Sequence, residues 1–558
     1  MPASLTHAFG IICFALTWLA YDHYRPWVNF HSEALALGGL SLLMASRLIS
    51  AGKFVSAPRL IAVVAAVACV PWLQWMGGVN YFGGDALISS FYLFALAMSI
   101  FVGYSLSVKP AKAVDFQSGF MHVLWIAAMA SAAIGLMQWL AVQNILQMYA
   151  VQTDPGDRAM GNLGQPNQLA TLLLMGVASY SMAYEKRLFG TPAFILGIAF
   201  LSVVLLLTES RTGLIGVVAV SAFLAWKNWR SKGRLSARAV LLWGLSCLAA
   251  RFLVPHMHAA LLLGTGRGMS LTDVQSRWLM WQQTAFGIGE APWFGYGWNH
   301  SSTAHAAGAI AFPGSLTFTN AHNVVLDLLA WNGVPLGLLL VGLCGYWLVS
   351  RMRRVQRPEA IYALACFLPL VVHSMLEYPF AYAYFIVAGG LLVGWVEGSI
   401  DRHKILILKV RFGAGFLALW VTAGAGVAYE YLQIEEDFRV VRFENLRIGT
   451  TPAEYDPPNI RLLSHMGAML RASRVKPSPG MDTQKIKELS EVARRFPYGA
   501  LALRNAIALG LNGDPEAASR QMAVIRGMYG EHYYAAAKAE LRSLQKEKHP
   551  QLNAVQVP

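Results

Sequence analysis

The chain has 558 residues, of which 56% are hydrophobic and only 13% are charged. A soluble domain carries roughly twice that charged fraction, so the composition excludes an ordinary soluble protein and indicates a polytopic membrane protein. The formal net charge of +14 does not indicate a nucleic-acid partner, because the basic residues lie in short clusters between apolar runs.

Apolar runs long enough to cross a hydrocarbon core recur along the chain and predict about thirteen transmembrane helices. The predicted spans centre on 7–22, 33–50, 59–76, 86–107, 120–144, 165–184, 192–208, 212–226, 239–254, 323–350, 359–377, 379–398 and 407–428. No basic segment precedes the first run and no small-residue cleavage site follows it. We therefore expect a retained span rather than a cleaved signal.

Basic residues occupy every second predicted loop, which is typical of loops that stay in the cytoplasm. They are Arg47, Lys53, Arg59, Lys109, Lys112, Lys186, Arg187, Lys227, Arg230, Lys232, Arg234, Arg238, Arg351, Arg353, Arg354, Arg357, Arg402, Lys404, Lys409 and Arg411. The pattern predicts a cytoplasmic N-terminus. The loop 255–321 and the tail after residue 428 then lie on the opposite face, which is the periplasm in a Gram-negative cell.

Two domains are predicted, a membrane domain over 1–428 and a periplasmic helical domain over 429–558. The tail is charged and has no apolar run of spanning length. Its N-G-D-P turn places Asp514 as a helix N-cap and Pro515 at the first helical position, which predicts a helical hairpin of the TPR-like kind. The fold class expected is an all-α polytopic bundle with this tail.

The loop 255–321 is a long polar insert between apolar runs. Long loops are usually either functional or disordered, and the Trp, Phe and Tyr content of this one argues against disorder. We therefore interpret it as the active-site loop, held at the membrane surface by the surrounding helices.

One polar cluster on the predicted outer face is the segment 157–168, which enters the sixth span. Gln165 and Asn167 have amides suited to sugar hydroxyls, and the guanidinium of Arg158 is suited to a phosphate. The alternative is an ordered loop with an asparagine N-cap.

Two arginines are candidates for binding an anion. Arg211 lies in E-S-R-T-G, where two spans join almost without a loop, and a charge at that boundary needs a partner or a function. An internal ion pair with Glu209 is the alternative. Arg277 lies in S-R-W-L-M-W, whose aromatics predict an interfacial helix facing the headgroups. A structural arginine that reaches the interface is the alternative there.

His322 opens the tenth predicted span and is followed by Asn323. A neutral histidine at a helix N-terminus is suited to act as a general base, although a structural, asparagine-capped histidine fits the same pattern. His373 and Glu377 lie one helical turn apart at the outer end of the eleventh span. They are functional candidates as intramembrane ionisable groups, and a structural pair is equally compatible.

Other kinds of chemistry leave no trace in the sequence. It has no phosphate-binding G-x-x-x-x-G-K-[ST] loop, no H-E-x-x-H motif, and no cysteines at metal-ligand spacing. A reaction outside the cytoplasm lacks ATP and sugar nucleotides, so its energy must come from an activated lipid-linked donor. We accordingly predict no cofactor and no metal.

Five motifs in order carry a family resemblance: G-N-L-G-Q-P-N-Q-L-A at 161–170, E-S-R-T-G at 209–213, S-R-W-L-M-W at 276–281, A-H-N-V-V-L-D-L-L-A-W-N-G at 321–333 and L-E-Y-P at 376–379. Together they resemble the O-antigen ligase superfamily, and within it the bacterial protein O-oligosaccharyltransferases of the PglL type. The resemblance covers about residues 120–400. The Q-P-N segment and the helical tail favour the protein-glycosylating branch.

The resemblance implies a GT-C-like glycosyltransferase whose donor is an oligosaccharide on undecaprenyl pyrophosphate. It implies Arg211 and Arg277 on the pyrophosphate and His322 as the base that activates an acceptor hydroxyl. The acceptor is then a Ser or Thr of a periplasmic protein such as a pilin, in a one-step, inverting transfer. Alternatives are an O-antigen ligase with lipid A–core as acceptor, an O-antigen polymerase, and a transporter or lipid flippase.

Overall fold

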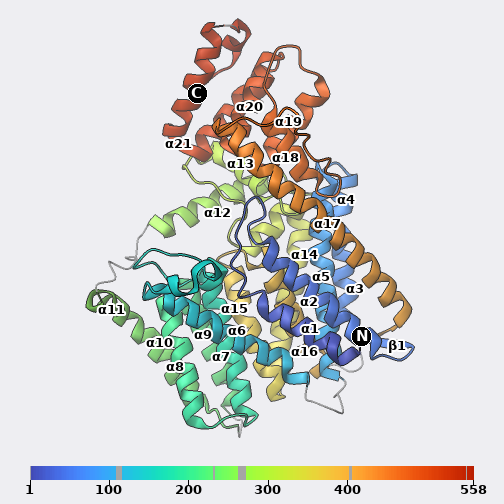
Figure 1. Ribbon diagram of the computed structural model, residues 1–558, viewed down its shortest axis with the longest axis vertical. Coiled ribbons are helices and arrows are strands. Elements are labelled where there is room, and N and C mark those ends of the chain that lie inside the picture. Colours follow the sequence, from blue (N-terminus) through green and yellow to red (C-terminus); the bar gives the residue numbers. More distant parts are fainter. Residues whose placement is uncertain are drawn as a thin grey trace. The chain divides into compact units, whose positions relative to one another are not determined.

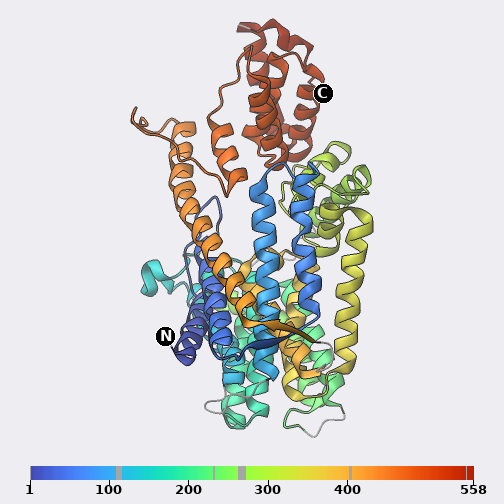
Figure 2. The same cartoon turned by 90° about the vertical axis from the view of Figure 1, so that its right-hand side faces the viewer.

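The computed structural model describes residues 2–108, 116–229, 233–261, 272–400, 405–547 and 549–557. Nearly all of its regular structure is helical (Figures 1 and 2). The chain forms two compact units. The first comprises Met1–Val67, Tyr92–Met269 and Tyr346–Gly424, and the second comprises Ala68–Phe91, Ser270–Gly345 and Ala425–Pro558. The predicted loop residues Lys109, Lys112, Arg230, Lys232, Arg402 and Lys404 lie outside the described residues, as does 262–271 of the predicted active-site loop.

Helices appear wherever a span was predicted. The elements up to residue 261 are α1 (Ala3–Leu16), α2 (Phe30–Ile49), β1 (Phe54–Pro58), α3 (Leu60–Ala68), α4 (Val70–Met76), α5 (Gly83–Val108), α6 (Phe116–Trp139), η1 (Gln143–Tyr149), η2 (Gly161–Leu163), α7 (Pro166–Glu185), α8 (Thr191–Leu207), α9 (Arg211–Asn228), α10 (Ala237–Ala250), η3 (Arg251–Leu253) and α11 (Val254–Ala260). The later elements are α12 (Thr272–Glu290), α13 (Ser301–Ala311), α14 (Val324–Arg354), α15 (Pro358–Ser374), η4 (Pro379–Ala381), α16 (Ala383–Ile400), β2 (Ile405–Lys409), α17 (Val410–Leu446), α18 (Ser464–Arg474), α19 (Thr483–Arg495), α20 (Gly499–Leu511), α21 (Pro515–Glu547) and η5 (Pro550–Ala554).

Seven helices of the described chain are long and apolar enough to cross a membrane: Phe30–Ile49, Gly83–Val108, Gly119–Trp139, Ala237–Ala260, Val324–Arg354, Ala383–Ile400 and Val410–Leu446. Further apolar helices of 10–17 residues include α1, α8 and α15. The all-α membrane class is thereby confirmed. The total of thirteen crossings stays a prediction, because several of the predicted spans correspond to these shorter helices.

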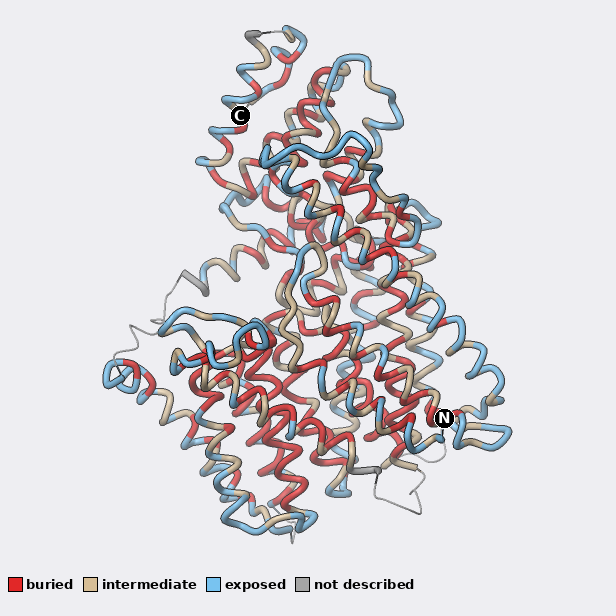
Figure 3. Tube along the Cα trace, in the orientation of Figure 1, coloured by how far each residue is buried: buried red, intermediate tan, exposed pale blue. Residues whose placement is uncertain are grey.

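The centre of the first unit is built on α7. Every residue from Gln168 to Tyr184 is buried, and α6, α8, α9 and α15 pack around this helix (Figures 1 and 3). In contrast, only 11% of the best apolar window of α17 is buried, against 83% for α16. An apolar helix with so much exposed surface is suited to face lipid. Because α7 is buried and packed by four helices, the polar residues at its N-terminus are held by a rigid element.

Loops predicted on the cytoplasmic face lie together in the first unit. β1 and β2 pair antiparallel, with Phe54 opposite Lys409, and form a short ribbon that the all-α prediction did not include (Figure 2). Both segments are short and rich in β-branched or apolar residues, which suits a two-stranded ribbon. A 2.7 Å ion pair between Lys186 and Glu359 joins two more of these loops. The predicted grouping of loops on one face is consistent with these contacts.

In the second unit, α14 is broken at Gly333, which has φ +74°, and Pro335 follows inside the helix. Proline lacks an N–H, so a carbonyl one turn earlier loses its helical partner. The loop 292–297 supplies replacements: the amide of Tyr296 donates to Ala330 at 2.8 Å and that of Gly297 to Trp331 at 3.1 Å. The predicted active-site loop is thus not irregular, since it contains α12 and α13 and is fastened to α14.

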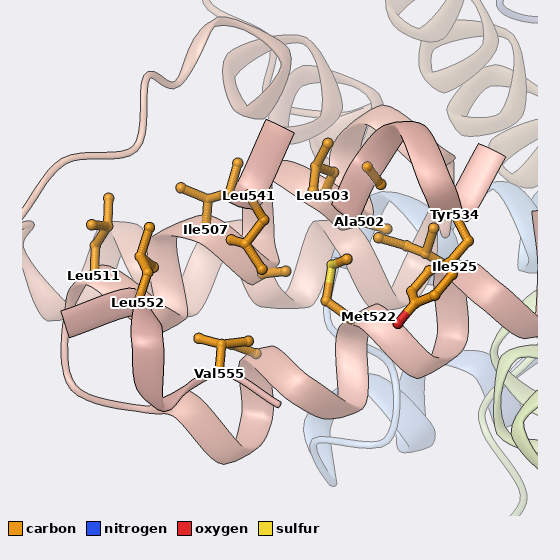
Figure 4. Packing of buried hydrophobic residues seen from close by; sticks show 13 residues of the cluster. Ala502, Leu503, Ile507, Leu511, Met522, Ile525, Tyr534, Leu541, Leu552 and Val555 are labelled. Carbon is orange, nitrogen blue, oxygen red and sulfur yellow. The ribbon is translucent and has the colours of Figure 1, made fainter. Parts of the chain in front are cut away.

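The tail forms helices α18–α21 of the second unit, and the predicted hairpin is confirmed as α20 and α21. Asp514 accepts a 3.0 Å bond from the amide of Ala517 and so caps α21, as expected, with Pro515 at its first position. Figure 4 shows the apolar core between these helices, which includes Leu503, Ile507, Met522, Ile525, Leu541, Leu552 and Val555. The TPR-like character of the tail stays a prediction.

Candidate active site

The loop before α7 is held tightly by side chains that accept and donate to its backbone. Gln138 on α6 accepts from the amide of Gly161 at 2.7 Å and donates to its carbonyl at 3.0 Å. Asn162 donates to the carbonyls of Leu19 and Tyr149 at 2.7 and 2.9 Å. Asn162 therefore joins two other loops and does not act as the N-cap of α7, the position that Gln165 occupies, half-buried.

Asn167 connects three of the sequence motifs. Its carbonyl oxygen accepts a 2.7 Å bond from the hydroxyl of Ser210, and its amide donates a 3.1 Å bond to the Glu377 carboxylate. These contacts bring the G-Q-P-N segment, E-S-R-T-G and L-E-Y-P to one place, although the bonded residues are 43 and 210 positions apart in the chain. The three motifs therefore belong to a single polar site in the first unit.

His373 and Glu377 both reach α7. The Nδ1 atom of His373 lies 2.9 Å from the hydroxyl of Thr171, one helical turn after Asn167, whose carboxylate partner is Glu377. The amide of Glu377 donates to the His373 carbonyl at 2.8 Å, so the two residues are fixed on one turn. Next to Asn167 in sequence, Gln168 accepts a 2.7 Å bond from the hydroxyl of Tyr384.

Arg211 is the first residue of α9 and is exposed. The preceding Ser210 caps the helix, because its hydroxyl accepts a 2.9 Å bond from the amide of Gly213. A helix N-terminus favours negative charge, and the guanidinium next to it adds a full positive charge with two-pronged donors. This end of α9 is therefore well suited to bind an anion such as a phosphate.

Two further arginines contact the turn before Arg211. The Nε of Arg158 donates a 2.7 Å bond to the carbonyl of Thr208, which brings the predicted residue Arg158 to this turn. Glu209, in the left-handed region with φ +48°, places its carboxylate 3.2 Å from Arg251 and 3.4 Å from His258. The Glu209 charge thus has two partners besides the one considered in the sequence.

In the second unit, His322 also lies in the left-handed region, with φ +52°. The side-chain oxygen of Asn323 accepts bonds from the amides of Val325 and Leu326 at 3.0 and 3.3 Å, so Asn323 caps α14. Asn323 therefore has the structural role that the sequence left open, and a contact with glycan or acceptor stays a prediction. The position of His322 at the mouth of this helix is as expected.

Arg277 lies on α12, half-buried, one turn before Trp281. The predicted interfacial aromatics have two different environments, because Trp278 is 62% exposed whereas the indole N–H of Trp281 donates to the Ala321 carbonyl at 3.1 Å. Trp281 thereby links α12 to the residue before His322.

Sequence reasoning missed several polar residues of both units, above all Ser210, Thr171 and Asp327. Asp327 is fully buried in α14, five residues after His322, and accepts bonds from Ser301 and Ala321. An acidic residue inside an apolar span is itself a functional signal, and it could have been found in A-H-N-V-V-L-D. Ser210 and Thr171 give no such signal, since isolated hydroxyls are common in spans.

A metal centre is not indicated by the described side chains, none of which form a group of three or more His, Cys, Asp or Glu suited to hold an ion. The absence of a metal or cofactor from the reaction stays a prediction.

Comparison with known families divides the chain into matched segments. Residues 159–179 match a family described as protein glycosylation ligase, residues 196–341 match O-antigen ligase, and residues 361–543 match the C-terminal part of virulence factor membrane-bound polymerase. Apart from Arg158, every predicted site residue falls within one of these segments. The polar site around Asn167 combines contributions from all three.

Two curated relatives come from Acinetobacter baylyi. A general O-oligosaccharyltransferase is 26% identical over 539 residues, which is 94% of this chain and 92% of the relative. A ComP-specific O-oligosaccharyltransferase is 23% identical over 408 residues, which is 70% of this chain and 73% of the relative. In these matches and in the order of its motifs, the chain is similar to the PglL-type branch of the O-antigen ligase superfamily.

Proposed function

We propose that the chain transfers an oligosaccharide from undecaprenyl pyrophosphate to Ser or Thr hydroxyls of periplasmic proteins such as pilins. The observation that carries the proposal is the polar site of the first unit, where Ser210, Asn167 and Glu377 are hydrogen-bonded beside Arg211. An exposed arginine at a capped helix N-terminus suits a pyrophosphate, and neighbouring amide and carboxylate groups suit sugar hydroxyls. The similarity to two O-oligosaccharyltransferases supports the same activity.

The donor pyrophosphate is assigned to Arg211, Arg277 and Arg158. Charge builds on the pyrophosphate as the glycosidic C–O bond breaks, so guanidinium groups that bind it more tightly at that moment lower the barrier. Arg211 has the best local setting of the three, since the N-terminus of α9 adds to its field. Arg158 is held beside it through the Thr208 carbonyl.

His322 is assigned as the general base. In the proposed step, a ring nitrogen of His322 removes the proton of the acceptor hydroxyl, and the hydroxyl oxygen attacks the anomeric carbon. The bond from that carbon to the pyrophosphate oxygen breaks, and undecaprenyl pyrophosphate leaves with both electrons. A single displacement of this kind inverts the anomeric configuration, and it needs no cofactor.

The remaining site residues are assigned to the glycan or the acceptor. They are Gln165, Asn167, Asn323, His373 and Glu377. Asn167 donates one hydrogen bond to Glu377, and together the amide and the carboxylate form a mixed set of donors and acceptors, which is the chemistry that vicinal sugar hydroxyls require. We further propose thirteen crossings of the inner membrane, a cytoplasmic N-terminus, and a periplasmic, TPR-like tail after residue 428 that helps to present the acceptor.

One observation favours a second candidate. The match of residues 361–543 to a membrane-bound polymerase family is compatible with another lipid-linked glycan as acceptor. An O-antigen ligase acting on lipid A–core would use the same donor site. Both alternatives change the acceptor and leave the roles of the arginines and the histidine unchanged.

The test is a transfer assay with the purified full chain in EDTA. It combines a lipid-pyrophosphate-linked oligosaccharide with three acceptors in separate reactions: a pilin-like protein, lipid A–core, and a second lipid-linked glycan. Glycan on the protein, abolished in His322→Ala, is the expected result. Transfer only to lipid A–core or only to the second glycan would replace the proposed acceptor, and unimpaired transfer by His322→Ala would overturn the role of the base.

A further inference from the structure

His322 is held in a backbone conformation that a side chain with a Cβ rarely adopts. Its φ of +52° lies in the left-handed region, where non-glycine residues are uncommon and strained. Such strain persists only where the surroundings enforce it, and it concentrates at functional positions. The residues that enforce the conformation of His322 are therefore relevant to its function.

The residue before His322, Ala321, is fixed at both of its backbone polar atoms. The amide of Ala321 donates a 2.8 Å hydrogen bond to Oδ1 of Asp327, and the carbonyl of Ala321 accepts a 3.1 Å bond from the indole N–H of Trp281. Ala321 is fully buried, so water does not compete for these bonds. Asp327 from α14 and Trp281 from α12 thus both form hydrogen bonds with Ala321.

Asp327 is itself fixed by a chain of donors. The hydroxyl of Ser301, the first residue of α13, donates a 2.5 Å bond to Oδ1 of Asp327, and the indole N–H of Trp331 donates a 2.7 Å bond to the Ser301 hydroxyl. Asp327 and Ser301 are fully buried, and Trp331 is 5% exposed. Two donors, the Ser301 hydroxyl and the Ala321 amide, therefore converge on one carboxylate oxygen, and Trp331 fixes the first of them, which leaves the carboxylate little freedom to move.

Asp327 and His322 also interact electrostatically. The other oxygen, Oδ2, is buried and accepts no hydrogen bond from any described residue. The remaining ionisable side chains that the structure describes on the two helices contacting this segment are Arg277 and Glu290 on α12 and His305 on α13. His305 stays neutral, because burial lowers its pKa to about 3.

We propose that Asp327 is a positioning residue for His322: through the Ala321 amide it holds the histidine in its strained backbone conformation, and its carboxylate stabilises the imidazolium. The inference rests on the proposed function of His322 as general base. When His322 takes the proton of the acceptor hydroxyl it becomes positively charged, and a fixed carboxylate nearby then lowers the energy of that state.

The first experiment compares Asp327→Asn with the unaltered chain, using the pH dependence of kcat/KM for transfer. Asparagine keeps an oxygen for Ser301 and Ala321 but removes the charge. We expect kcat to fall about 10²-fold with little change in KM for the lipid-linked donor. The acid limb of the pH profile moves to lower pH, because a base without a nearby carboxylate gives up its proton more readily. A lower rate with an unmoved limb overturns the proposal.

The second experiment separates the proposal from the function on which it rests. His322→Gln and the double variant His322→Gln/Asp327→Asn are assayed beside the single Asp327→Asn. If Asp327 acts through His322, the double variant is no slower than His322→Gln alone. If the loss of activity in the double variant is instead the product of the two single losses, the role of Asp327 is overturned. Full activity of His322→Gln overturns the proposed base instead, and the two failures are thereby distinguished.

A matched pair of serines controls for folding. Ser301→Ala removes the donor to Asp327, whereas Ser302→Ala removes a hydroxyl that donates to the carbonyl of Arg495 at 3.2 Å. Both residues are buried and adjacent on α13. We expect Ser301→Ala to lower kcat about tenfold and Ser302→Ala to leave it unchanged, with equal melting temperatures for both. Equal losses of activity in the two variants would contradict the specific role of the network.

Discussion

The hydroxyl of Ser210 donates a 2.7 Å hydrogen bond to Oδ1 of Asn167, and this bond joins the cap of α9 to the first turn of α7. Because the amide of the same asparagine donates to Glu377, Asn167 joins all three parts of the polar site. A side chain with both a donor and an acceptor is required there, and aspartate lacks the donor.

We therefore expect Asn167→Asp to place a second carboxylate against Glu377 and to lower transfer about 10²-fold. The loss of the Asn167 donor also leaves a buried carboxylate oxygen of Glu377 without this hydrogen bond, which lowers the free energy of unfolding by about 1–3 kcal/mol. Ser210→Ala serves as the comparison, since it removes one hydrogen bond to Asn167 and a cap worth about 1 kcal/mol but brings no second charge to Glu377. Initial rates and melting temperatures in detergent test both effects. Unchanged transfer by Asn167→Asp would remove the residue from the site.

Arg211→Ala is expected to lower kcat about 10²-fold or more without a change in melting temperature, because the side chain is exposed and its role lies in binding charge. Arg211→Lys restores only part of the rate, since an ammonium does not match two phosphate oxygens as a guanidinium does. The measurement is the rate at saturating lipid-linked donor.

The matched control for Arg211 is Arg238→Ala. Arg238 is likewise an exposed arginine in the first turn of a helix, α10, but lies on the predicted cytoplasmic face. The Arg238→Ala variant should transfer the oligosaccharide at the unaltered rate. If both variants lose activity to the same extent, the loss reports general basic charge and not an anion site at α9.

Much of the fold follows from hydropathy and charge alone. The apolar runs correctly located the helices, and Asp514 with Pro515 correctly located the start of α21. The pairing of β1 with β2 was missed, because two five-residue strands 347 positions or more apart leave no periodic signal. In the predicted active-site loop, α12 contains the helix that was predicted around Arg277, whereas α13 was missed.

The site was predictable as a set of residues and not as a network. Arg211, Asn167 and Glu377 stood out because polar groups are rare beside apolar runs. Asn167 bonds directly to Glu377, but further links of the network run through the hydroxyls of Ser210 and Thr171, which resemble those of many ordinary serines and threonines in helices. Left-handed backbone at Glu209 and His322 is likewise invisible in the sequence, because packing around those residues enforces it.

Acidification should destabilise the second unit. His465 and His300 are buried beside the 2.9 Å ion pair of Arg495 and Asp85, and burial lowers the pKa of both imidazoles, that of His465 to about 4. Below pH 6.5 the unfolded chain binds protons that the folded unit does not. The free energy of unfolding then falls by about 1.4 kcal/mol per pH unit for His465, down to about pH 4.

The stabilisation is thus complete above about pH 7 and is lost as the pH falls. Melting temperatures between pH 7.5 and 4.5 test the expectation, with His465→Gln as the comparison. Glutamine does not titrate, so the melting temperature of that variant should depend less steeply on pH. Parallel curves for the two proteins would show that His465 does not contribute.

The break in α14 at Gly333 should not tolerate a side chain. A Cβ at Gly333 would lie 2.4 Å from the backbone carbon of Trp293, and its φ of +74° is unfavourable for any L side chain. Neither the helix nor the clamped loop 292–297 can move away, because the amide of Val334 donates to Pro292 at 2.7 Å across the same contact. Gly333→Ala should therefore separate the loop from the helix and lower the yield of folded protein.

Gly342→Ala provides the control within the same helix. Nothing lies within 4 Å of a Cβ at Gly342, and its φ is not in the left-handed region. An alanine there is expected to raise stability by roughly 0.5–1 kcal/mol, because glycine in a helix interior loses more backbone entropy on folding. The measurement is the amount of monodisperse protein that each variant yields after detergent extraction. A Gly333→Ala variant that is as well folded as Gly342→Ala would show that loop 292–297 does not depend on the break in α14.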